Sequence, residues 1–191
     1  SHAEGYLSST VGLYSHAEGH NTNAVGESSH SEGGQIIVEG VIHKSTSVGK
    51  CSHSEGVGCT SVANYSHSEG DRTSATGITA HAEGTLTLAS GESAHSEGGF
   101  HINDGIIYKS TASGKYSHSE GISNASGFCS HAEGVDTTAS GSYSHAEGIE
   151  CIAYGMGSHA EGNYCKAFGK ASHVQGASCE TGNYTLVDGV Y

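Results

Sequence analysis

One five-residue word recurs along the chain, and this repeat constrains the fold more than any other feature. The word is Ser-His-Ala-Glu-Gly, as at residues 15–19, or a close variant of it. Copies start at Ser1, Ser15, Ser29, Ser52, Ser66, Ala80, Ala94, Ser117, Ser130, Ser144, Ser158 and Ser172. Most copies follow the previous one after 14 residues, whereas two steps are 23 residues long and one is 13. A fixed short period predicts a repeat architecture in which each unit buries its faces against its neighbours.

Each 14-residue unit has the pattern of two short strands. In residues 15–28 the word is followed by a second five-residue segment, 22–26, and both segments end in Gly. Small residues alternate with larger ones in each segment, which is the period of a β-strand, and Gly with two linking residues supplies a tight corner. The pattern predicts an all-β fold, a parallel β-solenoid or β-roll of about 12 coils stacked about 4.8 Å apart.

The composition predicts a narrow interior. The chain has 30 Gly, no Pro, no Trp and three Phe. The first, third and fifth positions of both segments are small, so we expect these side chains to point inward and to meet across a flattened coil. Such residues cannot fill a wide core, so the interior is expected to be narrow or shared between chains. The regular phase of the repeat argues against disorder, which is the competing reading of a Gly-rich and Ser-rich sequence.

Two polar positions of the word face outward in every copy and define a ladder. A polar position that does not vary within one chain is expected to make a specific contact and not merely to face solvent. We interpret this ladder as the contact with another copy of the chain. Solvent-exposed polar columns and a metal or anion site are the alternatives. The predicted ladder residues are His2, Glu4, His16, Glu18, His30, Glu32, His53, Glu55, His67, Glu69, His81, Glu83, His95, Glu97, His118, Glu120, His131, Glu133, His145, Glu147, His159, Glu161, His173 and Gln175.

Two long steps carry related inserts. Residues 34–44 and 99–109 each contain apolar runs around a Glu-Gly or Asn-Asp-Gly turn, a pattern typical of a β-hairpin. Either the hairpins brace a neighbouring chain or coil, or they form a recognition ridge. The repeat domain is expected to span residues 1–182, and residues 183–191 are expected to form a cap or the start of a neck.

Charge and cysteine content limit the classes of partner. The formal charge is −13 with all 15 His neutral, and only seven Lys and Arg are present, without a basic run. We therefore expect no nucleic-acid partner. No apolar run approaches the length of a membrane span, so no membrane insertion by this segment is expected. None of the six Cys lies in a CxxC motif, which favours free thiols and assembly in a reducing compartment.

The alternation SHAEGxxTxAxGxxSHAEG resembles the head repeat of trimeric autotransporter adhesins of the YadA-like type. It is also similar to repeats in phage and virus tail-fibre proteins. The resemblance implies a left-handed parallel β-roll assembled as a homotrimer. One departure concerns the seam between chains, because His16 and Glu18 and their counterparts occupy positions that are aliphatic in the common adhesin form. The implied trimer seam would therefore be filled by ion pairs. Since pairing raises the pKa of a His, we expect the greatest stability near pH 5 to 6.

The predicted function is a non-enzymatic fibre segment. It would act as a rigid spacer and attachment element of a virion tail fibre, with a host-cell receptor as partner besides the homotrimer. The alternatives are the head of a bacterial surface adhesin, which binds cells or matrix outside the cell, and a carbohydrate-binding or ice-binding solenoid. Twelve equivalent copies single out no nucleophile, so we predict no enzyme activity, catalytic residue, metal site or cofactor. Four Tyr that precede the word, Tyr14, Tyr65, Tyr116 and Tyr143, are interpreted as corner packing between chains or as an aromatic binding stripe.

Overall fold

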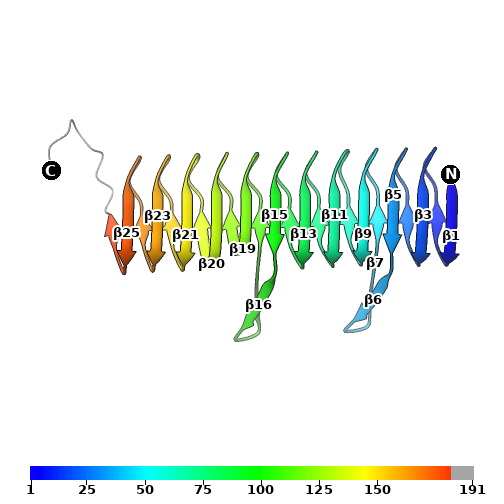
Figure 1. Ribbon diagram of the computed structural model, residues 1–191, viewed down its shortest axis with the longest axis horizontal. Helices are drawn as coiled ribbons and strands as arrows, with labels where there is room; N and C mark the ends of the chain where they lie inside the picture. The colour runs from blue at the N-terminus through cyan, green and yellow to red at the C-terminus, as the bar shows by residue number, and fades with distance from the viewer. Residues whose placement is uncertain (182–191) are drawn as a thin grey trace.

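The computed structural model describes residues 1–181, and these residues form a rod of stacked coils (Figure 1). One strand of each coil begins at the His of the word. These strands are β1 (His2–Tyr6), β3 (His16–His20), β5 (His30–Gly33), β9 (His53–Val57), β11 (His67–Asp71), β13 (His81–Thr85), β15 (His95–Gly98), β19 (His118–Ala125), β20 (His131–Ala139), β21 (His145–Ile149), β23 (His159–Asn163) and β25 (His173–Ala177).

The second segment of each coil forms a shorter strand on the opposite face. These strands are β2 (Ser9–Thr10), β4 (Asn23–Ala24), β8 (Thr46–Ser47), β10 (Thr60–Ser61), β12 (Ser74–Ala75), β14 (Leu88–Ala89), β18 (Thr111–Ala112), β22 (Ile152–Ala153), β24 (Lys166–Ala167) and β26 (Glu180–Thr181). In two coils the second segment is the end of β19 and of β20, which run through both faces.

The pairing is parallel and in register from coil to coil. In β1 and β3, His2 pairs with His16 and Glu4 with Glu18, and the same His-to-His and Glu-to-Glu register recurs along the ladder. The rings of successive His are 4.7–5.2 Å apart, which matches the spacing of neighbouring strands. The predicted all-β parallel solenoid with coils of about 14 residues is therefore confirmed. Its left-handedness stays a prediction from the resemblance.

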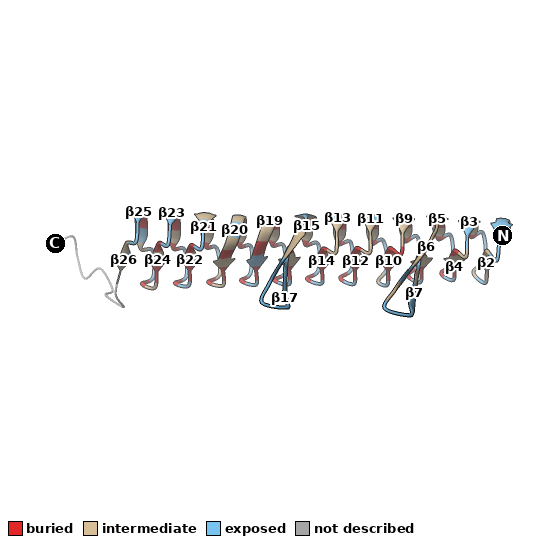
Figure 2. Ribbon diagram, turned by 90° about the horizontal axis from the view of Figure 1, so that it is seen from below, coloured by how far each residue is buried: buried red, intermediate tan, exposed pale blue. Residues whose placement is uncertain are grey.

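The interior is as narrow as the composition predicts. The buried side chains are almost all Ala, Ser, Thr and Cys, and Val174 is the largest of the buried apolar residues described. Buried segments recur from coil to coil along the rod (Figure 2). Ala17 and Ala24 are fully buried, as is Thr22. The first and third positions of both segments thus point inward, as does the Gly that ends the second segment. The Gly that ends the word is half-buried or exposed, as at Gly19 and Gly33, so the expectation that this fifth position lies inside is wrong. Little apolar area per residue stabilises the coil. Backbone hydrogen bonds between coils supply the regular cohesion instead.

Corner chemistry explains why the word begins with Ser and ends with Gly. The hydroxyl of Ser144 donates to the carbonyl of Gly141, at 2.6 Å, and so closes the turn before the strand. The Gly that ends the word cannot be replaced without strain. In Gly70, φ is +109°, and a Cβ would lie 2.1 Å from the carbonyl oxygen of Gly84 in the next coil. Close stacking of the coils therefore requires Gly here.

Both predicted hairpins are present. The first consists of β6 (Gln35–Val38) and β7 (Val41–Lys44), and the second of β16 (Phe100–Asn103) and β17 (Ile106–Lys109), each antiparallel. Both turns, at 39–40 and 104–105, have two residues with positive φ, as in a type I′ turn. The hairpins leave the rod on the same side and lean toward the short-strand face (Figures 1 and 2).

The 13-residue step changes the rod locally. β19 lacks one corner residue, so its register against β20 shifts between Ile122 and Ser123. As a result, Asp136 of β20 has no counterpart in β19. The expected cap or neck at 183–191 lies outside the described residues.

Candidate interaction face

The predicted ladder residues lie together on one face of the rod. We call this surface the ladder face, and it consists of the outward His and Glu of the first strand of each coil. The His rings form one continuous stack from His2 to His173. From His16 to His159, neighbouring rings are nearly parallel, with interplanar angles of 0–5°. In this central part the side chains are about one-third to one-half exposed. The predicted positions thus stack in register on one surface, and their role as a seam between chains stays a prediction.

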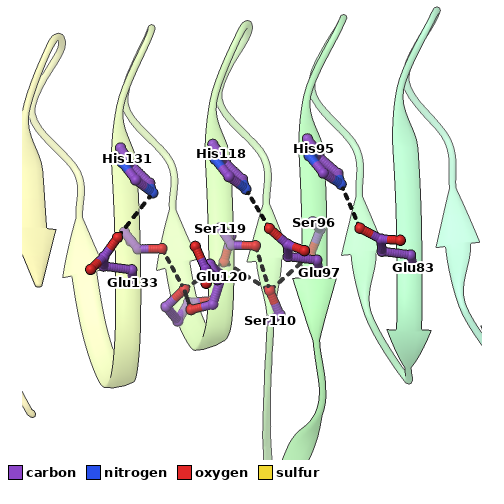
Figure 3. Close-up of polar contacts among 12 residues, drawn as sticks. Glu83, His95, Ser96, Glu97, Ser110, His118, Ser119, Glu120, His131 and Glu133 are labelled. Atoms are coloured by element: carbon purple, nitrogen blue, oxygen red, sulfur yellow. Dashed lines mark hydrogen bonds and ion pairs between the residues drawn. The ribbon is translucent and has the colours of Figure 1, made fainter. Parts of the chain in front are cut away.

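Ten of the twelve ladder His have a carboxylate oxygen within 4.0 Å, whereas His2 and His67 have none at that distance. His95 and Glu83 are 3.2 Å apart, and His118 and Glu97 are 3.1 Å apart, so both pairs form hydrogen bonds (Figure 3). In other coils the Nε2 atom lies 3.6–4.0 Å from a carboxylate oxygen of its own coil or of the preceding one. At the end of the ladder, the Gln175 amide donates to Glu161 at 2.7 Å. The ladder is therefore a column of loose contacts with a few tight ones.

Several His nitrogens are buried without a hydrogen bond. Among the described residues, the Nε2 atoms without a partner belong to His16, His30, His53, His67, His81, His131, His145 and His159. A buried polar atom without a partner costs free energy, about 1 to 3 kcal/mol. Because a carboxylate is close to most of these nitrogens, a small rearrangement of the face would satisfy them.

Burial and stacking lower the basicity of four His in the ladder. The pKa of His67 and of His131 lies below its ordinary value, because burial and the neighbouring stacked His disfavour the charged form more than the Glu carboxylates favour it. The pKa of His30 and of His159 is lowered as well, with burial the largest cause. The expectation that pairing raises the pKa is therefore wrong for these four His in the single chain. The sequence reasoning considered the Glu partners and missed the like-charged neighbours in the stack.

The ladder geometry is poor for a shared metal ion. Groups such as His16, Glu18 and His30 place one potential ligand atom each within 4.8 Å of one another. However, parallel rings 4.7–4.9 Å apart direct their nitrogen lone pairs side by side. Two such nitrogens do not converge on an ion at the usual distance of about 2.1 Å. We therefore assign no metal to this face.

Other predicted features also have definite positions. Tyr14, Tyr65, Tyr116 and Tyr143 lie at the corners and are 47–78% exposed. Phe128 lies between two of them and contacts Tyr116 and Tyr143 edge to face. All six Cys are free: Cys59, Cys151 and Cys165 are buried, Cys179 is half-buried, and Cys51 and Cys129 are exposed. Among residues 1–181, no helix is long and apolar enough to cross a membrane.

The fold defines the chain as a parallel β-solenoid with a periodic His and Glu face. No protein-family model matches the chain, and a search of curated proteins finds no relative. The resemblance to adhesin heads and tail fibres therefore rests on the repeat and on the coil geometry.

Proposed function

We propose that this chain is a non-enzymatic segment of a trimeric fibre, in which the ladder face of each copy packs against two others. One observation carries the proposal: the ladder face is polar and nearly invariant along the rod, while outward positions on the short-strand face vary freely. Val25, Leu88 and Tyr154 illustrate this variation. Solvent alone does not require one side chain to recur in every coil.

The charge of the ladder face supports the ladder face of another copy as its partner. In a single chain the pKa of His30, His67, His131 and His159 is lowered, so these His do little to compensate the column of eleven Glu at pH 7. Like charges at this spacing repel one another. A neighbouring ladder face would bring further His to these carboxylates and would exclude water from both, which strengthens the hydrogen bonds.

Assembly should therefore take up protons. When carboxylates of a second and third chain approach the His stack, each added negative charge raises the His pKa. The assembled state then binds more protons than the separate chains, and association strengthens as the pH falls toward about 5.5. The sequence-derived expectation of greatest stability near pH 5 to 6 is kept for the assembled fibre only.

The cysteines favour a virion tail fibre over a bacterial surface adhesin. Cys59, Cys151 and Cys165 occupy a slot that holds Thr in other coils, and they are free and buried. Free thiols are more common in proteins that assemble in a reducing compartment, such as the cytosol of a host cell. We propose a rigid spacer and attachment element of a virion as the role, with the adhesin head as the alternative.

Sedimentation at about pH 5.5 and about pH 8.5 tests the assembly. The expected result is an elongated trimer of three 19.4 kDa chains at the lower pH that dissociates at the higher pH. A monomer at both values refutes the trimer and places the ladder face in solvent.

Two matched variants test which face assembles. Glu83→Lys changes the ladder face, where Glu83 bonds to His95. Glu92→Lys makes the same change of charge at a corner, where Glu92 pairs with Lys115. We expect the first variant to shift the trimer toward monomer by more than about tenfold in concentration and the second to have little effect. Equal effects would show that net charge, and not the ladder face, controls assembly.

A further inference from the structure

A groove lies between the second hairpin and the short-strand face. It consists of two adjoining cavities of about 370 and about 420 Å³, which share Tyr108 of the hairpin and Asp136 of the rod. One end is lined by Ile122 and Asn124, and the other extends along the rod. Since the hairpins lean toward the short-strand face, this groove stays open when the ladder face is covered (Figure 2).

The 13-residue step explains why this hairpin has a groove beneath it. Asp136 occupies the corner position that lacks a counterpart in β19, so the rod surface below the hairpin is irregular. At the first hairpin, Arg72 occupies the equivalent corner position. There the chain packs closely, because a Cβ on Gly58 would lie 2.9 Å from the Cβ of His43 and 3.2 Å from the Cγ of Arg72. The two hairpins are related in sequence but differ in what lies beneath them.

The groove combines aromatic and hydrogen-bonding side chains. Tyr108 is 37% exposed and Tyr164 is 48% exposed. Tyr108 is held by a parallel stack on His101, at 4.9 Å, and His101 is 3.7 Å from Asp136. Glu150 and Lys166 also line the far cavity, so acceptors and a donor face the same space.

We propose that this groove binds a saccharide, one or two hexose or N-acetylhexosamine units. A pyranose ring has an apolar C–H face and a rim of hydroxyl groups, so it needs an aromatic surface beside carboxylates and amines. Tyr164 supplies the surface, while Asp136 and Glu150 accept from hydroxyl groups and Lys166 donates to them. Asp136, Glu150 and Tyr164 occupy the same corner position in three successive coils, so they lie about 4.8 Å apart along the rod.

This site names a class of ligand for the attachment role, so the inference rests on the proposed function. It uses residues that the ladder face does not. Loss of trimerisation and loss of saccharide binding are therefore separate results, and sedimentation of the same sample reports the first.

Saturation-transfer NMR on the full chain tests the site, with glucose, galactose, mannose, fucose, N-acetylglucosamine and N-acetylgalactosamine as probes. We expect transfer to at least one of these sugars. Tyr164→Asn and Glu150→Gln should each weaken binding about tenfold, the effect of losing one aromatic or charged contact. Tyr143→Asn is the matched control, because Tyr143 is also an exposed corner Tyr with positive φ but lies outside the groove.

Asn is chosen for both Tyr substitutions because it tolerates the left-handed backbone of these corners. Equal melting temperatures of the two variants would confirm that each retains the fold. Absence of transfer to every sugar, or transfer that survives Tyr164→Asn and Glu150→Gln unchanged, overturns the proposal.

Discussion

Close stacking of the coils predicts that Gly70→Ala will be among the most damaging single-methyl changes in the rod. Its Cβ would lie 2.1 Å from the Gly84 oxygen, where a normal contact is above 3 Å, so the coils must separate by about 1 Å. The positive φ adds strain of about 1 to 2 kcal/mol. Loosening about two hydrogen bonds between β11 and β13 adds about 1 kcal/mol each. We expect a loss of about 3 to 4 kcal/mol in the free energy of unfolding.

Substitutions at two other glycines distinguish the effect of backbone strain from the effect of the clash between stacked coils. Gly176→Ala has the same kind of backbone, with φ of +125°, but the nearest atom to the added Cβ is the Cys179 Sγ at 3.5 Å, so only the strain applies. Gly34→Ala meets no atom within 4 Å and should change stability by less than about 0.5 kcal/mol. Guanidinium unfolding followed by circular dichroism measures all three. Equal losses for Gly70→Ala and Gly176→Ala would refute the stacking argument.

The remaining predictions concern pH, the corner hydroxyl and the thiols. In dilute samples that are monomeric, the lowered pKa of His67 and His131 means that the unfolded chain binds more protons than the folded chain. The melting temperature should therefore fall as the pH drops below about 6.5. A rise in melting temperature would contradict the lowered pKa values. Ser144→Ala removes the bond to Gly141 and should cost about 1 kcal/mol by denaturant titration, which a neutral result would contradict. Cys51 should react with a thiol reagent in the native chain, whereas Cys59 is buried with a raised pKa and should react only on unfolding, as mass spectrometry of labelled peptides can check.

The spacing of the word predicted most of the fold. A period of 14 fixes which residues stack, so His16 above His30 and Ala17 above Ser31 follow from the sequence. The Asn-Asp-Gly turn predicted the second hairpin, because this turn is determined by the local sequence. The stacking of the His rings was not predicted, because ring orientation depends on the corner geometry and not on spacing.

The groove escaped prediction for a different reason. The sequence shows the 13-residue step, but the step alone does not indicate that Asp136 of the next coil is left without a counterpart. The repeat pattern does not predict the direction in which the hairpin leaves the rod, because that direction depends on the packing of the hairpin against later coils. The contacts of His101 with Tyr108 and Asp136 supply that direction only after the chain has folded.

A solenoid repeats each outward side chain at the spacing of its strands, and this makes a titratable column a coupled system. Protonation of one ladder His disfavours protonation of the His above and below it. Burial is the largest cause of the lowered pKa of His67, and the stacked His53 and His81 lower it further. Protons therefore enter the column over a broad pH range, and no single pKa describes it. If ladder faces pair in a fibre, the number of protons taken up should grow with the number of coils in contact. The pH dependence of assembly would then measure the length of the interface, so a rod shortened by several coils should assemble with a shallower pH dependence than the full rod.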